Sequence, residues 1–319
     1  MAKIQPVDKV EILILVDNYV DVLLPGNDFV QRPALAKEGK IGTETLVAEH
    51  GLCLLITVHM NGESHSVLLD AGYNGFSLRH NLRLLDLPLD RVEAVVVSHG
   101  HMDHTGGLET VLEDMKRPVK VIVHPDAFAK RFADFPDRGK VTFPTVITRE
   151  KLKLLGADVV ESTAPLSLAD DSMLVTGSVP RVTGFEKGFV GALKESGGKL
   201  VPDSIEDDQA IVVNIKDKGL VVISGCAHSG IINTLLYARE LTGEARVHAV
   251  IGGFHLVGPD AETLVSRTVE EMKSIAPEVI VPMHCTGWAS VRRIAAEFPG
   301  EFVTSSVGTK LVLPKSSVA

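Results

Sequence analysis

The stretch SHGHMDHTGGL, residues 98–108, decides which fold and which chemistry we expect of this chain. It follows an apolar, β-branched run and places His99, His101, Asp103 and His104 within six residues. A loop at the end of a strand can turn sharply, so the first two histidines can face one ion while Asp103 and His104 face another. Imidazole and carboxylate together suit zinc, iron or manganese better than calcium or magnesium. The spacing therefore predicts a metal centre.

The HxHxDH pattern followed by TGGL resembles the metallo-β-lactamase superfamily, and the resemblance covers most of the chain. It implies an α/β fold, the αββα sandwich, in which two mixed β-sheets carry helices on their outer faces. LLDAG (68–72) resembles the family's first motif, which implies that Asp70 orients the histidine loop and does not bind metal directly. PMHCTG (282–287) resembles the last motif, which implies that His284 is a ligand of the second metal.

Two positions depart from the family's pattern. Members normally have a histidine between the HxHxDH motif and a later Gly-Asp, whose aspartate bridges both metals. Here the only histidine from 105 to 224 is His124, which we interpret as structural because it follows an ordinary apolar run. At the Gly-Asp position the chain has Gly225-Cys226, and His228 follows two residues later.

This departure resembles a subgroup of the superfamily, the one named for dihydropterin–ribofuranosylaminobenzene 5′-phosphate synthase. The motifs GCAHSGIINT (225–234), GGFHL (252–256) and TLVAEHGLCLLI (45–56) carry the resemblance, together with PMHCTG. It implies that His228 supplies the missing imidazole beside His99 and His101. Cys226 either replaces the bridging carboxylate as a thiolate or is a small buried group in a turn. A catalytic Cys–His dyad is the weaker interpretation, because the metal motif already explains activation.

Other polar side chains are candidates for the same site. His255 in GGFHL either moves protons at the rim, which with Asp103 makes it a catalytic candidate, or caps a turn in the core. Arg181 and Glu186 begin a long loop; they either contact substrate, Arg181 binding phosphate and Glu186 an amino-bearing ring, or form an ordinary loop ion pair. The roles of Glu49 and His50 stay open.

Apolar runs alternate with segments of helical periodicity along the chain. A helix expected from Asp126 to about Asp134 continues this pattern. The stretch 181–208, rich in glycine and charge, breaks it, and we interpret that stretch as a functional loop. A hairpin turning at Asp217 to Gly219 is expected next. We expect strands at 11–16, 52–58, 66–72, 94–100, 119–125, 247–253 and 278–284, a last strand pair ending near 313, and helices at 75–87, 106–115, 230–242, 260–275 and 288–298.

Composition limits the class of protein. With 319 residues, 45% of them apolar, the chain can bury a large core, and we expect one domain over 1–319 with an active-site loop at about 181–208. Three scattered cysteines favour a reducing, cytoplasmic compartment over a disulfide framework. No apolar stretch approaches the roughly 20 residues of a membrane span. A net charge of −9 without a Lys/Arg cluster argues against nucleic acid, so we expect a small anionic substrate; a homo-oligomer is an open alternative.

Three functions are compatible with these motifs. The first is a metal-dependent hydrolase in which one or two divalent ions, zinc before manganese, iron or magnesium, activate water for attack on a phosphoester or phosphodiester. The second, implied by the subgroup, is a transferase that joins a dihydropterin-methyl pyrophosphate to an arylamine ribose phosphate. The third is a metal-binding sensor without turnover. In each case His99, His101 and His228 would hold one ion, and Asp103, His104 and His284 the other.

Overall fold

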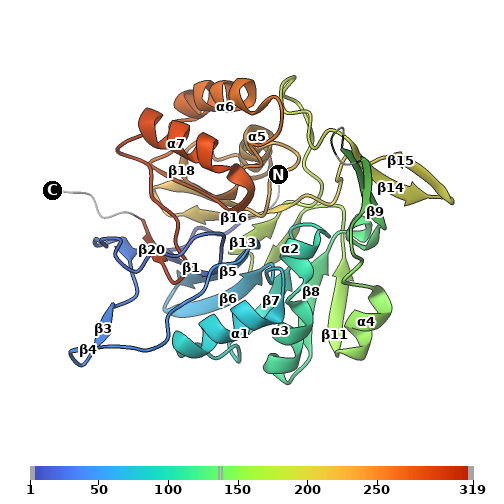
Figure 1. The fold of residues 1–319 in the computed structure, drawn as a ribbon. Coiled ribbons are helices and arrows are strands. Elements are labelled where there is room, and N and C mark those ends of the chain that lie inside the picture. Colours follow the sequence, from blue (N-terminus) through green and yellow to red (C-terminus); the bar gives the residue numbers. More distant parts are fainter. Residues whose placement is uncertain (1–3, 136, 138, 315–319) are drawn as a thin grey trace.

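The computed structural model describes residues 4–135, 137 and 139–314, and two β-sheets packed face to face form its centre (Figure 1). The larger sheet contains, in spatial order, β11 (Ala157–Glu161), β8 (Val119–Val123), β7 (Val92–Val96), β6 (Glu63–Leu69), β5 (Cys53–Met60), β1 (Lys9–Val16), β20 (Lys310–Leu313) and β2 (Val30–Gln31). The second sheet contains β12 (Leu166–Leu168), β13 (Met173–Val175), β16 (Ala210–Ile215), β17 (Gly219–Ser224), β18 (Val247–Gly253) and β19 (Val279–Met283).

The facing surfaces of the two sheets form the central core. From Lys9 to Ile14, residues of β1 alternate between partly and fully buried, as expected of a strand with one face against another sheet. Ile12 of β1 and Ile56 of β5 are 0% exposed, and they share one apolar cluster with Val213 and Ile251 of the second sheet. β-Branched side chains fit this pleated, interdigitating surface well, which explains why isoleucine and valine dominate the strands.

Helices cover the outer face of each sheet, and this confirms the predicted αββα sandwich (Figure 1). Their apolar stripes explain the packing: in α6 (Ala261–Ile275), Val265, Val269 and Met272 recur at spacings of four and three, and all three are buried. α1 (Gly75–Leu84), α3 (Leu108–Met115) and α4 (Arg149–Leu154) pack on the larger sheet, and α5 (Ile231–Thr242), α6 (Ala261–Ile275) and α7 (Trp288–Glu297) on the second.

Parallel pairing determines where a site can form. In the larger sheet β6, β7, β8 and β11 are parallel neighbours, and in the second sheet β17, β18 and β19 are. The carboxyl ends of parallel strands meet at one edge of a sheet. The two edges touch at Gly225, where an added Cβ atom would lie 2.1 Å from Ser98 Oγ, so only glycine permits this approach.

One expectation about the middle of the chain was wrong, and the structure adds detail to a second. The helix predicted from Asp126 to about Asp134 is a 3₁₀ turn, η1 (Pro125–Phe128), followed by β9 (Arg131–Phe135), in which Arg131 and Ala133 point inward at strand spacing. The predicted loop 181–208 contains a hairpin of β14 (Ala192–Ser196) and β15 (Lys199–Pro202). With β10 (Gly139–Thr142), these strands form a separate sheet, β10-β9-β14-β15, which we call the side sheet.

The remaining predictions of single elements were close to the structure. The hairpin between β16 and β17 turns at Asp217 to Gly219 as predicted, and both of these residues have positive φ. The helix predicted at 106–115 corresponds to α3, and a separate short helix, α2 (Met102–Thr105), precedes it. Of the predicted last strand pair, β20 forms between β1 and β2 of the larger sheet, and Phe302 makes an isolated bridge to Ile280.

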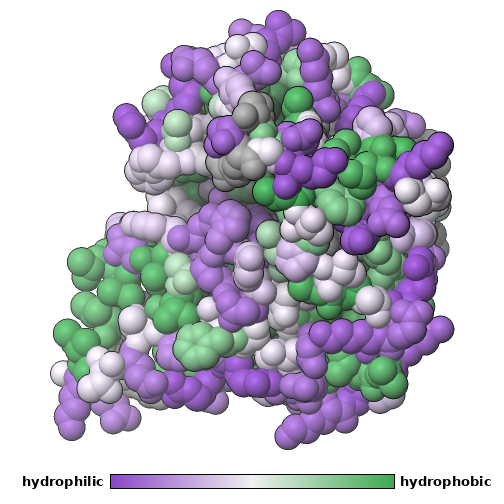
Figure 2. Space-filling model, turned by 45° about the vertical axis from the view of Figure 1, so that its right-hand side comes forward, coloured by the Kyte–Doolittle hydropathy of each residue, from purple (hydrophilic) through white to green (hydrophobic). Residues whose placement is uncertain are grey.

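The surface is mixed in polarity. Figure 2 shows hydrophobic side chains interspersed with hydrophilic ones on the face it presents. Large exposed apolar residues include Leu23, Leu35 and Ile41, from the segment between β1 and β5, which also contains the small hairpin of β3 (Ala36–Lys37) and β4 (Lys40–Ile41). Within the described ranges, no helix has the length and apolar character required to cross a membrane.

Candidate metal centre

Most of the histidines and cysteines expected at the site line one cavity of about 350 Å³, at the edge where the parallel strands of both sheets end. The lining residues, all from the described part of the chain, include neither lysine nor arginine. They are Asn18, His50, His101, Met102, Asp103, Phe143, Phe189, Cys226, His228, His255, Val257, His284, Cys285 and Gly287.

His99, His101 and His228 form the first cluster. Each offers a ring nitrogen within 4.8 Å of the others, and His99 Nε2 and His101 Nδ1 are 2.9 Å apart. The first two residues follow β7 of the larger sheet, whereas His228 follows β17 of the second sheet. The cluster is therefore assembled across the interface between the sheets.

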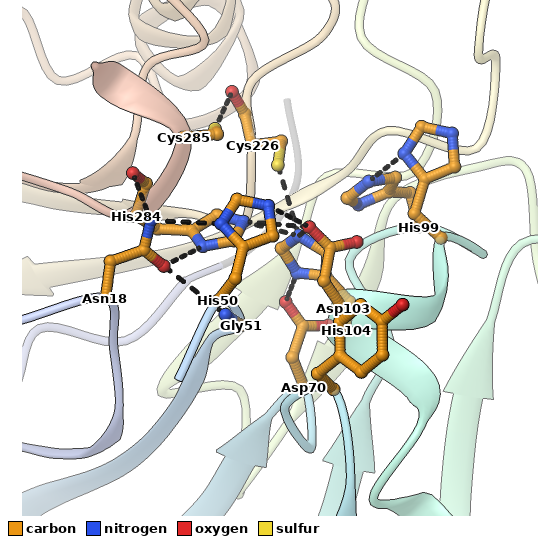
Figure 3. A network of polar contacts seen from close by, with 12 residues as sticks. Asn18, His50, Gly51, Asp70, His99, Asp103, His104, Cys226, His284 and Cys285 are labelled. Atoms are coloured by element: carbon orange, nitrogen blue, oxygen red, sulfur yellow. Dashed lines mark hydrogen bonds and ion pairs between the residues drawn. The ribbon is translucent and has the colours of Figure 1, made fainter. Parts of the chain in front are cut away.

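Asp103, His104 and His284 form the second cluster. His104 Nε2 lies 3.1 Å from His284 Nε2, and His284 Nε2 lies 3.3 Å from Asp103 Oδ2 (Figure 3). The short helix α2 carries Asp103 and His104, and η2 (His284–Thr286) begins at the third member. Like the first cluster, this one combines ligands from both sheets.

Cys226 lies between the two clusters. Its Sγ atom is 3.1 Å from His104 Nε2 and belongs to a group with His99 and His104 in which the candidate ligand atoms lie within 4.8 Å of one another. Cys226 is buried, and the residue after it, Ala227, has a left-handed backbone with φ of 54°. The thiol thus lies close to candidate ligand atoms of both clusters.

Two buried carboxylates make polar contacts with His104 and His284. Asp70, directly after β6, lies with Oδ2 2.6 Å from His104 Nδ1 and accepts hydrogen bonds from the backbone N–H and the hydroxyl of Ser98. On the other side, Asp17 Oδ1 accepts a hydrogen bond of 2.9 Å from the backbone N–H of His284. The geometry of Asp70 is that of a residue that orients a ligand.

Asn18 was not predicted from the sequence. Its Oδ1 atom lies 3.1 Å from His284 Nδ1, and its Nδ2 atom lies 3.1 Å from His50 Nδ1 (Figure 3). The ring of His50 in turn places Nε2 3.4 Å from Asp103 Oδ2 at the exposed mouth of the cavity. The available signal was the position of Asp17-Asn18 directly after the first apolar run, the same strand-end position that Asp70 occupies.

Comparison with known proteins agrees with this geometry. Residues 47–284 match the family model of the metallo-beta-lactamase superfamily. The chain belongs to the metallo-β-lactamase superfamily. It is 30% identical, over 80% of its length and 87% of the relative's, to the 7,8-dihydropterin-6-methyl-4-(beta-D-ribofuranosyl)-aminobenzene-5′-phosphate synthase of Methanocaldococcus jannaschii. It is 35% identical to an uncharacterized protein of the same archaeon, over 78% of this chain and 88% of that one.

A solved structure is similar over nearly the whole chain. It is a metal-dependent hydrolase of the β-lactamase superfamily, with a TM-score of 0.71 and 26% identity over 97% of this chain and 100% of that chain. Superfamily membership and the named synthase relative support enzyme status, and members of the superfamily generally bind divalent metals. These similarities leave open which reaction this member catalyses.

The residues present fit the divalent ions that the superfamily implies. His228 is 2% exposed, yet neither of its ring nitrogens has a hydrogen-bond partner within the described ranges. A buried imidazole without a partner is costly unless something else binds it. Burial lowers the pKa of His99 and His228, and burial with the charge of Arg131 lowers the pKa of His101 to about 3, so all three rings are neutral at pH 7. Neutral imidazole is the form that binds metal.

The second cluster has a different charge state. Burial alone would lower the pKa of His104, but the carboxylates of Asp70 and Asp103 raise it to about 9. Burial would raise the pKa of Asp103, but the charge of His104 and the hydrogen bond of His284 lower it below its usual range. Without an ion this cluster therefore holds a protonated imidazole beside a carboxylate.

His255 lies next to the first cluster. Its ring centroid is 4.3 Å from that of His228, and its backbone has a φ of 44° at the end of the β18 segment. The neighbouring Cys285 points its Sγ atom at the carbonyl of Cys226, 3.7 Å away. His255 thus lies at the cavity wall.

The other candidates lie outside the cavity lining. Glu186 is buried, and its carboxylate accepts hydrogen bonds from the backbone N–H groups of Ile232 (2.9 Å) and Asn233 (2.8 Å) at the start of α5. Arg181 donates to the carbonyls of Ser204 and His228. His124 has both ring nitrogens engaged: Nε2 lies 2.9 Å from Ser178 Oγ, and Nδ1 accepts from Asp126.

Proposed function

We propose that this protein is a metal-dependent hydrolase that acts on a small phosphorylated substrate. The observation that carries the proposal is that both ligand clusters adjoin one cavity, with Cys226 between them and both His228 nitrogens unpartnered among the described residues. Divalent ions in such sites lower the pKa of water toward about 7 and polarise a phosphoryl oxygen. The similarity to the solved metal-dependent hydrolase supports this class of reaction.

The residues of the site would have three separate roles: metal binding, orientation of the ligand rings and proton transfer. His99, His101 and His228 would hold one ion and Asp103, His104 and His284 the other, with Asp70 and Asn18 fixing the rings of His104 and His284. His255 would hold a proton for the leaving group from the cavity wall. Since the described cavity lining has no lysine or arginine, a phosphate would bind there through the metal-ligand region and its histidines.

A hydrolysis assay tests the proposal. Protein loaded with zinc or manganese is incubated with phosphomonoesters and phosphodiesters, and release of phosphate or alcohol is measured. We expect chelation to abolish the activity and His228→Ala to lower it at least about 100-fold. His124 is a buried histidine outside the cavity, so His124→Ala should change the activity less than about 3-fold. Metal-loaded protein without any such hydrolysis would contradict the proposal.

A second candidate function is group transfer. It is favoured by 30% identity to the pterin-dependent synthase over most of both chains. In that reaction a dihydropterin-methyl pyrophosphate and an arylamine ribose phosphate would join, with loss of pyrophosphate, at the same ligand set. Incubation with this substrate pair and detection of pyrophosphate separates transfer from hydrolysis. Tight metal binding without turnover in either assay would favour the third alternative, a sensor.

A further inference from the structure

Three consecutive polar residues, Asp207, Asp208 and Gln209, are buried directly before β16. Their exposures are 0%, 2% and 3%. Buried polar groups of this kind are costly unless they make specific hydrogen bonds. They end the stretch in which we had expected a loop, and none of the functions considered above uses them.

The first and last of these residues bind the backbone of the HxHxDH loop. Asp207 Oδ2 accepts a hydrogen bond of 2.7 Å from the N–H of Gly100, the residue between His99 and His101. Gln209 donates from its backbone N–H to the carbonyl of Ser98 (3.0 Å) and from Nε2 to the carbonyl of Val97 (2.8 Å). The backbone on both sides of His99 is therefore held by this segment.

The middle residue binds the turn that carries the remaining ligand of the first cluster. Asp208 Oδ2 accepts a hydrogen bond of 2.9 Å from the N–H of Ser229, directly after His228. The HxHxDH loop follows the larger sheet and this turn follows the second sheet. Adjacent residues of one short segment thus tie the two loops that supply the first cluster, although these loops lie far apart in sequence.

A buried arginine supports the segment from the side sheet. Arg131 of β9 is 4% exposed and donates to both carboxylate oxygens of Asp207, through Nη1 at 3.0 Å and through Nη2. Its Nε atom donates to Asp203 Oδ2 at 2.8 Å. The planar guanidinium fixes the Asp207 carboxylate in the orientation that meets Gly100.

We infer that Asp207 and Asp208 are positioning residues for the first metal site. They set the distance between the His99–His101 loop and the His228 turn, and Arg131 fixes Asp207 in place. Apart from Arg131, the hydrogen-bond donors to these carboxylates named above belong to the two loops of the first cluster. Gly100 and Ser229 adjoin ligands of the first cluster, whereas Asp103 and His104 of the second cluster lie further along, on α2, so the larger effect on metal affinity is expected at the first site. The inference rests on the proposed metal centre.

The test measures Co²⁺ affinity in proteins that keep a single site. His284→Ala leaves the first cluster, and His228→Ala leaves the second. In the His284→Ala background, Asp207→Ala and Asp208→Ala are expected to weaken Co²⁺ binding about 10- to 100-fold and to change the visible absorption of the bound ion. In the His228→Ala background, the same substitutions are expected to change the affinity less than about 2-fold.

Two matched variants separate positioning from general loss of stability. Asp203→Ala removes the second carboxylate that accepts a hydrogen bond from Arg131. No contact of Asp203 with either metal loop is described, so this variant should have a lower melting temperature but an unchanged Co²⁺ affinity. Asp208→Asn keeps an oxygen that can accept from Ser229 and should restore affinity to within about 3-fold of the parent, because the hydrogen bond to the turn is retained.

The outcomes are distinguishable. Equal loss of affinity at both sites, equal loss in Asp203→Ala, or unchanged first-site affinity in Asp207→Ala and Asp208→Ala would each overturn the inference. Wild-type protein that binds Co²⁺ but hydrolyses no phosphoester would contradict the proposed function while the inference stands. Wild-type protein that binds no Co²⁺ would overturn both.

Discussion

His228 shows how one side chain can distinguish a metal centre from a cluster of ordinary histidines. Both His228 and His124 are buried, but the ring nitrogens of His124 are hydrogen bonded to Ser178 and Asp126, whereas neither ring nitrogen of His228 has a hydrogen-bond partner among the described residues. We therefore expect His228→Ala to lower the metal bound per chain by about one ion and His124→Ala to leave it unchanged. Elemental analysis of protein purified under identical conditions measures this. Equal metal content in the two variants would indicate that His228 has a structural role and does not bind metal.

The opposite charge states of the two clusters lead to a pH prediction. With its pKa raised to about 9, His104 must release a proton when an ion binds the second cluster at pH 7, whereas His101, with its pKa lowered to about 3, has none to release. Affinity at the second site should therefore rise about 10-fold per pH unit from pH 6 toward pH 9, and affinity at the first site should stay nearly constant.

Calorimetry in buffers of different ionisation enthalpy counts these protons. The single-site variants His284→Ala and His228→Ala allow each cluster to be titrated alone. We expect close to no proton released at the first site and about one at the second. The same proton count at both sites would contradict the assigned charge of His104.

At the level of single elements, Glu186 caps the N-terminus of α5. That helix begins at Ile231 after Gly230, which has no side chain to cap it, and Glu186 reaches across to accept from two of its first N–H groups. Glu186→Ala should lower the free energy of unfolding by about 2–3 kcal/mol and leave KM unchanged for the folded fraction. Urea denaturation measures the first effect, with the exposed neighbour Lys187→Ala as the control. A raised KM at unchanged stability would instead support contact with substrate.

Elements with strong local signals were predictable and the others were not. The β-branched runs and the spacing of leucines indicated the strands and helices of both sheets, and the HxHxDH loop is recognisable because its ligands lie within six residues. The segment after His124 misled us because RFADF has no clear alternation of polar and apolar residues: Arg131 points inward, and its charge is neutralised by Asp203 and Asp207 from a distant stretch. Sequence order does not reveal such partners.

The backbone conformation at the strand ends could not be predicted from the sequence either. Asp70, Ala227, His255 and His284 all have positive φ, between 44° and 63°, and all lie at or next to the cavity. Only glycine signals this conformation in a sequence, because other residues adopt it at a cost of roughly 1–2 kcal/mol. Strain of this kind concentrates at functional sites, where it directs side chains into the cavity. Asn18 and Asp207 were missed for a related reason: single polar residues carry no spacing pattern.

For the whole molecule, the placement of the ligands couples metal binding to folding. The larger sheet supplies His99, His101, Asp103 and His104, and the second sheet supplies His228 and His284. The unfolded chain keeps only the local HxHxDH ligands together, so it should bind an ion more weakly than the folded protein. An ion present at 100 times its Kd then stabilises the fold by about 2.7 kcal/mol for each site.

Chelation should therefore lower the melting temperature by several degrees, and added zinc should restore it. In the double variant His228→Ala/His284→Ala each cluster lacks the ligand from the second sheet. Apart from Cys226, the remaining candidate ligands come from residues 99–104 and stay near one another in the unfolded chain, so an ion gains less from folding. The melting temperature of this variant should therefore respond to chelator much less than that of the wild type, although the local loop can still bind some zinc. A wild-type melting temperature that chelator leaves unchanged would contradict a metal centre shared between the sheets.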